Sequence, residues 1–183
     1  DFSLARLKHY TGTPPEHFQQ FVLFTNYVRY VDEFVGVAID TLRRKDSRFT
    51  ALSVPGAVYE PGELTNAEAQ IAAGQWRRHQ MPAYHLMADD RTGITLVNIG
   101  VGPSNAKTVC DHVAVLRPHA WMMLGHCAGL RNSQQLGDYV LGHGAAGVVH
   151  EIALAMRHRI GAAAAMAQQW PDSHRRRGAR FRL

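Results

Sequence analysis

A strand, a glycine-rich turn, a helix and a second strand follow one another between residues 93 and 125, and this order constrains the fold more than any other feature of the sequence. Residues 93–99 are an apolar run that ends in a Gly-Val-Gly-Pro turn. From Ser104 onward apolar residues recur at helical spacing, and residues 121–124 are apolar again. A helix that crosses over between two strands of one sheet makes those strands parallel. The sequence therefore predicts an α/β fold.

The rest of the chain alternates between apolar runs and amphipathic segments in the same way. Residues 1–19 are an exception, because they are polar and contain one glycine and two prolines, which predict an irregular lead-in. Thr65 and Glu68 fit a capping box at the start of an alanine-rich helix. Further strands are expected at residues 21–24, 49–54, 84–87 and from 137 onward, with helices at 27–44, 65–79 and 151–169 and a loop at 55–62.

The net charge of +5 lies entirely in the last forty residues. Residues 1–143 hold 13 basic and 13 acidic side chains, whereas residues 144–183 hold 7 arginines and 2 acids. Domains that bind nucleic acid usually carry a basic stripe over their body, so we do not expect nucleic acid as a partner. The arginine-rich tail is expected to be a solvated end, with polyanion binding as the alternative.

The composition also argues against a membrane protein and against a metal centre. No run of about 18 apolar residues is present, as a membrane-spanning helix would require. Cys110 and Cys127 are too far apart for a CxxC motif and fit reduced thiols of a cytoplasmic protein. Zinc would need two further ligands beside His126 and Cys127. Because adjacent side chains point apart, we expect this pair to pack or to line a ligand rather than to form a catalytic dyad.

Three turns follow apolar strands, and each stands at the carboxyl end of its strand. Ligands of open α/β sheets bind at these ends, so the turns predict one shared ligand site. The candidate residues at the three turns are Asn26 and Arg29; Gly100, Val101 and Gly102; and Gly125, His126 and Cys127.

Each candidate has a structural alternative. The glycines allow close backbone approach to a phosphate or a sugar hydroxyl beside a helix N-terminus, or simply a tight turn. The dinucleotide fingerprint GxGxxG is not met, because Asn105 stands in place of its third glycine. Arg29 either clamps an anion or pairs with Asp32 or Glu33 on its own helix. Asp138, after a glycine, fits a turn-stabilising carboxylate.

Several long segments of the chain resemble the catalytic domain of bacterial AMP nucleosidases. They are residues 8–19, 23–34, 79–83, 93–108, 116–118, 125–131 and 137–141. The resemblance covers about residues 1–143 and implies a truncated form of the nucleoside phosphorylase/nucleosidase fold, a three-layer α/β sandwich with a mixed sheet. The tail at 144–183, rich in alanine and arginine, does not resemble the family.

The resemblance implies hydrolysis of AMP to adenine and ribose 5-phosphate. Asn26 and Arg29 match the family's anion-binding turn, which would place the phosphate at Arg29. Val101, between its glycines, matches a ribose-lining position, and residues 125–127 match the segment around ribose and base. A general acid protonates the leaving adenine near N7 while a polar group stabilises the sugar cation, so that no metal or redox cofactor is needed. The family also implies homohexamers that share residues between neighbouring subunits, and an N-terminal regulatory domain.

The sequence departs from the family in its later part. The Met-Glu pair that would hold the ribose and the Ser-Asp pair whose Asp is the general acid are both missing, so no catalytic residue is assigned. An out-of-frame reading of a GC-rich gene would produce a tail of this composition, and Ala128 replaces a glycine of the relatives. We therefore expect exposed apolar surface and little catalysis by this chain alone. The alternatives are a nonenzymatic nucleotide-binding remnant and another purine nucleosidase or phosphorylase.

Overall fold

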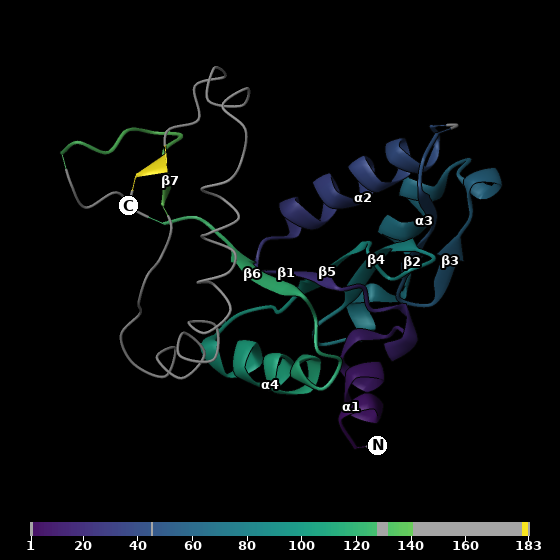
Figure 1. Ribbon diagram of the computed structural model, residues 1–183, viewed down its shortest axis with the longest axis horizontal. Helices are drawn as coiled ribbons and strands as arrows, with labels where there is room; N and C mark the ends of the chain where they lie inside the picture. The colour runs from purple at the N-terminus through teal and green to yellow at the C-terminus, as the bar shows by residue number, and fades with distance from the viewer. Residues whose placement is uncertain (1, 45, 128–131, 141–180, 183) are drawn as a thin grey trace. The chain divides into compact units, whose positions relative to one another are not determined.

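The structure is a computed structural model that describes residues 2–44, 46–127, 132–140 and 181–182. It divides into two compact units, Asp1–Gly125 and His126–Leu183. Each unit is described by itself below (Figure 1).

The first unit is built on a six-stranded sheet with the order β3-β2-β4-β5-β1-β6. Strands β5, β1 and β6 are parallel, whereas the pairs β2–β3, β2–β4 and β4–β5 are antiparallel. The sheet is therefore mixed, as the resemblance implied. Its strands are β1 (Phe21–Thr25), β2 (Phe49–Val54), β3 (Ala57–Tyr59), β4 (Ala83–Ala88), β5 (Ile94–Asn98) and β6 (Ala120–Leu124).

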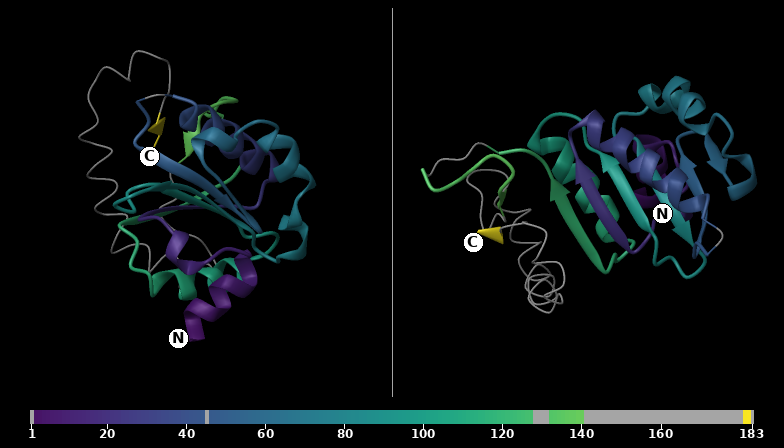
Figure 2. Two further views of the ribbon diagram at one scale, coloured as in Figure 1. Left: turned by 90° about the vertical axis from the view of Figure 1, so that its right-hand side faces the viewer. Right: turned by 90° about the horizontal axis from the view of Figure 1, so that it is seen from above.

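Helices cover both faces of this sheet. Figures 1 and 2 show α2 and α3 on one face and α1 and α4 on the other. This arrangement gives three layers and confirms the predicted α/β sandwich. The α-helices are α1 (Phe2–Thr11), α2 (Val28–Leu42), α3 (Ala67–Ala73) and α4 (Pro103–Ala114), and the short 3₁₀ helices are η1 (Pro15–His17), η2 (Pro61–Glu63) and η3 (Gln75–Arg78).

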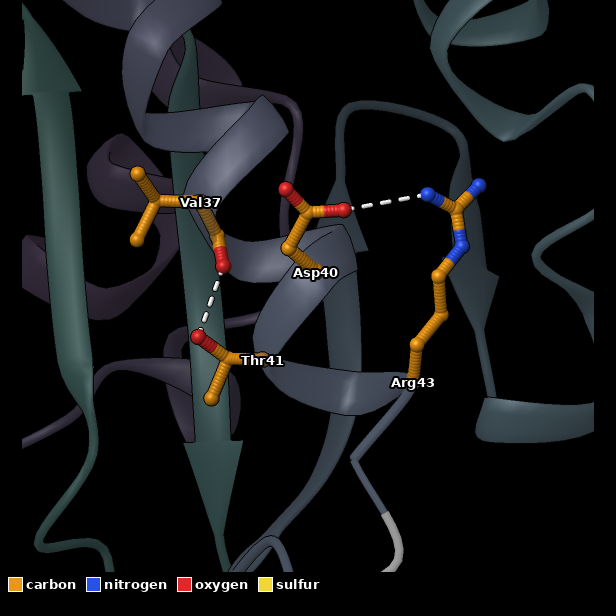
Figure 3. A network of polar contacts seen from close by, with 4 residues as sticks. All are labelled: Val37, Asp40, Thr41 and Arg43. Carbon is orange, nitrogen blue, oxygen red and sulfur yellow. Dashed lines mark hydrogen bonds and ion pairs between the residues drawn. The ribbon is translucent and has the colours of Figure 1, made fainter.

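Helix α2 is held by its apolar stripe rather than by its surface polar contacts. Near its end Thr41 Oγ1 donates to Val37 O over 2.7 Å, and Arg43 pairs with Asp40 at 3.0 Å (Figure 3). Both charged side chains are more than half exposed, and such pairs contribute less than about 1 kcal/mol. Each buried valine, leucine or isoleucine contributes roughly 1.5–3 kcal/mol. The stripe consists of Val31, Val35, Ala38, Ile39 and Leu42.

A buried chain of hydrogen bonds anchors the N-terminal segment to the opposite face of the sheet. Thr11 Oγ1 donates its only hydrogen to Leu7 O over 2.7 Å. Thr13 Oγ1, which lies 3.1 Å from Thr11 Oγ1, must therefore be the donor in that contact. Nε2 of His85 lies 2.8 Å from the same Thr13 hydroxyl. Because the hydrogen of Thr13 is already used, His85 Nε2 carries a proton and donates it.

The second ring nitrogen of His85 completes the chain. Thr95 Oγ1 accepts from the backbone N–H of Gln19 at 2.9 Å and lies 2.9 Å from His85 Nδ1. Because burial keeps the imidazole neutral and its one hydrogen is on Nε2, Nδ1 accepts from the Thr95 hydroxyl. Burial, with a smaller contribution from the charge of His17, lowers the pKa of His85 to about 3. The ring therefore stays neutral over the whole physiological range.

The N-terminal segment differs from the sequence-based prediction. Residues 2–11 form helix α1 instead of an irregular lead-in, because Leu7 is fully buried and the helix packs against α4. Tertiary packing of this kind outweighs weak local propensity. The predicted breakers act only at the helix end, where Gly12 has a φ of +72°.

Two further predictions around residues 55–79 are wrong. No capping box forms, because Asn66 takes the N-cap position of α3 with a left-handed φ of 61° and no side-chain cap. The expected single helix is divided between α3 and η3. The expected loop at 55–62 contains β3, which forms a hairpin with β2 through Gly56 at a φ of +84°.

In the second unit, strand β7 (Tyr139–Val140) pairs in parallel with β8 (Phe181–Arg182). The turn before β7 is closed by Asp138, whose Oδ2 accepts from Gln135 N at 3.0 Å while its own N–H donates to Gln135 O at 3.1 Å. This confirms Asp138 as a turn-stabilising carboxylate. The helix expected at 151–169 lies outside the described residues.

Candidate functional site

The ends of the three strands that precede the predicted turns lie side by side at one edge of the first unit. Strand β1 lies between β5 and β6, and Thr25 is in register with Asn98 on one side and Leu124 on the other. The N–H of Ile99 donates to Thr25 O over 2.8 Å. A Cβ placed on Gly125 would lie 3.9 Å from Asn26 Oδ1. The expected convergence of Asn26, the glycine loop and Gly125 is therefore confirmed.

The loop from Gly100 to Gly102 has a backbone that other residues would adopt only with strain. Gly100 has a φ of +63° and Gly102 a φ of +102° with a ψ of 153°. Asn98 Oδ1 accepts from the N–H of Gly100 at 3.0 Å and fixes the start of the loop. Val101 between the two glycines is 87% exposed. The glycines thus leave the apolar Val101 exposed at the carboxyl edge.

Two helices begin at this edge, and both present free N–H groups there. Helix α2 begins after Tyr27 and helix α4 after Gly102, each without a side-chain cap. Within the described residues, the N–H groups of Val101 and Gly102 also donate to no acceptor. Free N–H groups and the positive ends of two helix dipoles favour an anion or a polar ligand.

Arg29 lies in the first turn of α2 at the same edge. Its side chain is exposed, and it forms no ion pair with any residue that the structure describes. The alternative pairing with Asp32 or Glu33 is not formed among the described residues, and the role of Arg29 in binding an anion stays a prediction. An unpaired guanidinium beside a helix N-terminus suits a phosphate group.

Two residues of this edge were missed by sequence reasoning. Asn105, noted only as a departure from a glycine motif, donates its side-chain amide to Ile99 O at 3.0 Å. Gln80, which follows η3, in turn donates to Asn105 Oδ1 at 3.0 Å. An amide in the first turn of a helix after a glycine loop is the signal that could have pointed to the first contact, but nothing local predicts the second.

His126 and Cys127 belong to the second unit, where both are exposed, and their role in lining the site stays a prediction. Ala128 lies outside the described residues. Cys110, by contrast, is buried in α4, and burial raises the pKa of its thiol to about 12. A thiol with so high a pKa is a poor nucleophile at neutral pH.

The described residues contain neither a candidate metal centre nor a candidate membrane span. No group of three or more His, Cys, Asp or Glu side chains among them is placed to hold a metal ion. None of the described helices combines the length and hydrophobicity that spanning a bilayer requires.

The AMP nucleosidase of Escherichia coli K12 is 62% identical to this chain over 143 residues, and the same values hold for the AMP nucleosidase of Escherichia coli O157:H7. Over this stretch the chain is homologous to AMP nucleosidases. The match covers 78% of the chain but only 30% of either relative, so the chain spans less than a third of their length. No family model matches the sequence.

A solved structure supports the same fold. The crystal structure of AMP nucleosidase from Bacteroides thetaiotaomicron VPI-5482 superposes with a TM-score of 0.53 at 23% identity. The superposition covers 78% of the present chain and 46% of the Bacteroides chain. The stretch covered by this comparison therefore has the same fold as that protein.

Proposed function

We propose that this chain is part of an enzyme that hydrolyses the N-glycosidic bond of AMP to give adenine and ribose 5-phosphate. The observation that carries the proposal is the 62% identity to AMP nucleosidases over 143 residues. The unpaired guanidinium of Arg29 would bind the 5′-phosphate, with Asn26 beside it. The loop at 100–102 would line the ribose, and residues 125–127 would enclose ribose and base.

The reaction needs two functions from the site: residues that bind AMP and a general acid that donates a proton. Cleavage of the glycosidic bond places positive charge on the sugar and negative charge on the purine, which a general acid neutralises by protonation. Of the described residues, those at the edge of the first unit (25–31, 98–105 and 124–125) include no carboxyl group. We therefore propose that these residues bind and orient AMP, and that the proton comes from elsewhere in the complete site.

A nucleotide-binding remnant without turnover is the second candidate, and the same lack of a carboxyl group among these edge residues favours it. Adenine release from AMP by the purified chain, measured beside calorimetric AMP binding, separates the two. Turnover supports the enzyme, and binding without turnover supports the remnant. The absence of both turnover and binding would contradict both candidate functions. Adenosine in place of AMP, and phosphate in place of water, test the alternative of another purine nucleosidase or phosphorylase.

We also propose that the protein is a cytoplasmic homo-oligomer, with a hexamer as the specific expectation. Two free cysteines among the described residues fit a reducing compartment. Light scattering coupled to size-exclusion chromatography tests the assembly, and a monomeric mass at all concentrations would contradict it.

A further inference from the structure

The side chain of Asn105 holds the glycine loop from the inside. Its Nδ2 amino group donates to Ile99 O at 3.0 Å and to Val101 O at 3.4 Å, which are the carbonyls on either side of Gly100. The amino group of Asn105 thus holds the two carbonyl groups between which the loop turns at Gly100. A Cβ placed on Gly100 would lie 3.5 Å from the same Nδ2 atom, so the loop is folded closely around it.

The remaining atom of the Asn105 amide is fixed from outside the loop. Oδ1 accepts from Gln80 Nε2 at 3.0 Å. This contact determines which way the amide faces, because a flipped Asn105 would set its oxygen against two carbonyls and its amino group against that of Gln80.

Gln80 stands on a segment that is itself held on both sides. The N–H of Met81 donates to Tyr10 O at 3.0 Å, and the N–H of Asn98 donates to Pro82 O at 2.9 Å. These bonds connect the end of α1 and the end of β5 to Met81 and Pro82, the two residues that follow Gln80. A continuous path therefore runs from α1, through Gln80 and Asn105, to the loop.

We propose that Asn105, oriented by Gln80, is a positioning residue that holds the Gly100–Gly102 loop in the shape that binds the ribose 5-phosphate half of AMP. The inference rests on the proposed function. Neither amide needs to touch the ligand, since both act through the backbone carbonyls of the loop. Without the hydrogen bonds from Asn105, the loop would keep its bond from Gly100 N–H to Asn98. Its later part would then turn more freely, because glycine has the least restricted backbone of all residues.

The test uses the full chain and three variants: Gln80→Met, Asn105→Leu and the double variant. Both substitutions are uncharged and similar in size to the residues that they replace. Calorimetric titration with AMP and with ribose 5-phosphate gives the dissociation constants. We expect each single variant to raise both constants by about tenfold, as the loss of one or two neutral hydrogen bonds would. The double variant should be no weaker than Asn105→Leu, because Gln80 acts only through Asn105.

Gln70→Met in α3 is the matched control, since its side chain lies away from the loop, and it should bind both ligands as the unaltered chain does. Urea unfolding serves as the second readout. Gln80 is exposed, so Gln80→Met should keep the unfolding midpoint, whereas a merely structural role would lower it.

Two outcomes overturn the inference in distinguishable ways. Normal affinity in Gln80→Met, or additive losses in the double variant, would exclude the positioning role while the proposed function stands. Failure of the unaltered chain to bind either ligand would contradict the proposed function and the positioning role with it.

Discussion

Thr95 Oγ1 lies 2.9 Å from Nδ1 of His85 and donates its hydrogen to it, while the same oxygen accepts from the N–H of Gln19. One hydroxyl thus joins the first residues of the chain to strands β4 and β5. Thr95 and His85 are both fully buried, so neither contact can be replaced by solvent.

Thr95→Val should destabilise the chain by about 1–3 kcal/mol, because it leaves Gln19 N–H and His85 Nδ1 without partners in the interior. Valine keeps the shape of threonine, so the loss measures the hydrogen bonds rather than packing. Thr50→Val on strand β2 is the control, because Thr50 is exposed. Equal urea midpoints for the two variants would contradict the expectation.

The stability of the chain should fall as the pH is lowered from about 6.5 toward 3, and His85 should account for about one proton of this slope. Burial lowers the pKa of His85 to about 3 in the folded state, whereas an unfolded histidine titrates near 6.5. Below pH 6.5 the unfolded chain therefore takes up a proton that the folded chain excludes, which costs up to about 1.4 kcal/mol per pH unit.

His85→Gln isolates this contribution, because burial lowers the pKa of His17 as well and other groups titrate in the same range. Urea unfolding at pH 7 and pH 5 should show a smaller loss of stability in the variant than in the unaltered chain. The same loss in both proteins would place the titrating group elsewhere.

Gly102→Ala should destabilise the chain by about 1–3 kcal/mol, since its φ of +102° and ψ of 153° are nearly exclusive to glycine. Gly36→Ala in α2 should instead stabilise it by about 0.5–1 kcal/mol, because that glycine is helical and a Cβ there would meet nothing within 4 Å. Thermal unfolding of both variants checks the pair. A similar change in the unfolding temperature of both variants would mean that a side chain at position 102 causes no backbone strain.

Arg29→Ala should raise the dissociation constant for AMP by about ten- to a hundredfold, the usual range for a hydrogen bond to a charged group. The same variant should leave the dissociation constant for adenosine unchanged, because adenosine carries no phosphate. Stability should not change, since Arg29 is exposed and has no ion pair among the described residues. Arg43→Ala, at the other end of α2, controls for net charge, and equal losses in the two variants would remove Arg29 from the phosphate site.

Strands β1, β2, β4, β5 and β6 and the convergence of their ends could be predicted because apolar runs and strand ends are local signals, whereas β3 lay in an expected loop. Helix α1 could not, because only Leu7 and Thr11 of its residues are buried and its stability comes from packing on α4. The position of β1 between β5 and β6 is also not local information. Nor is the Gln80–Asn105 contact, which joins residues 25 positions apart. Within the site, sequence reasoning predicted which segments meet but not what holds them in shape.

We expect the chain of hydrogen bonds through His85 to disfavour misaligned pairings of strand β4. Strand β4 pairs in antiparallel fashion on both sides, and its residues alternate between the two faces. A slip by one residue would send Tyr84 or Leu86 to the threonines and would carry the imidazole into the apolar layer under α2. Leu86 has no polar side-chain atom, and Tyr84 offers one hydroxyl oxygen where the imidazole offers two separate nitrogens to Thr13 and Thr95. A misaligned register thus loses the hydrogen bonds of His85 in the interior, and this loss favours the native register of the sheet.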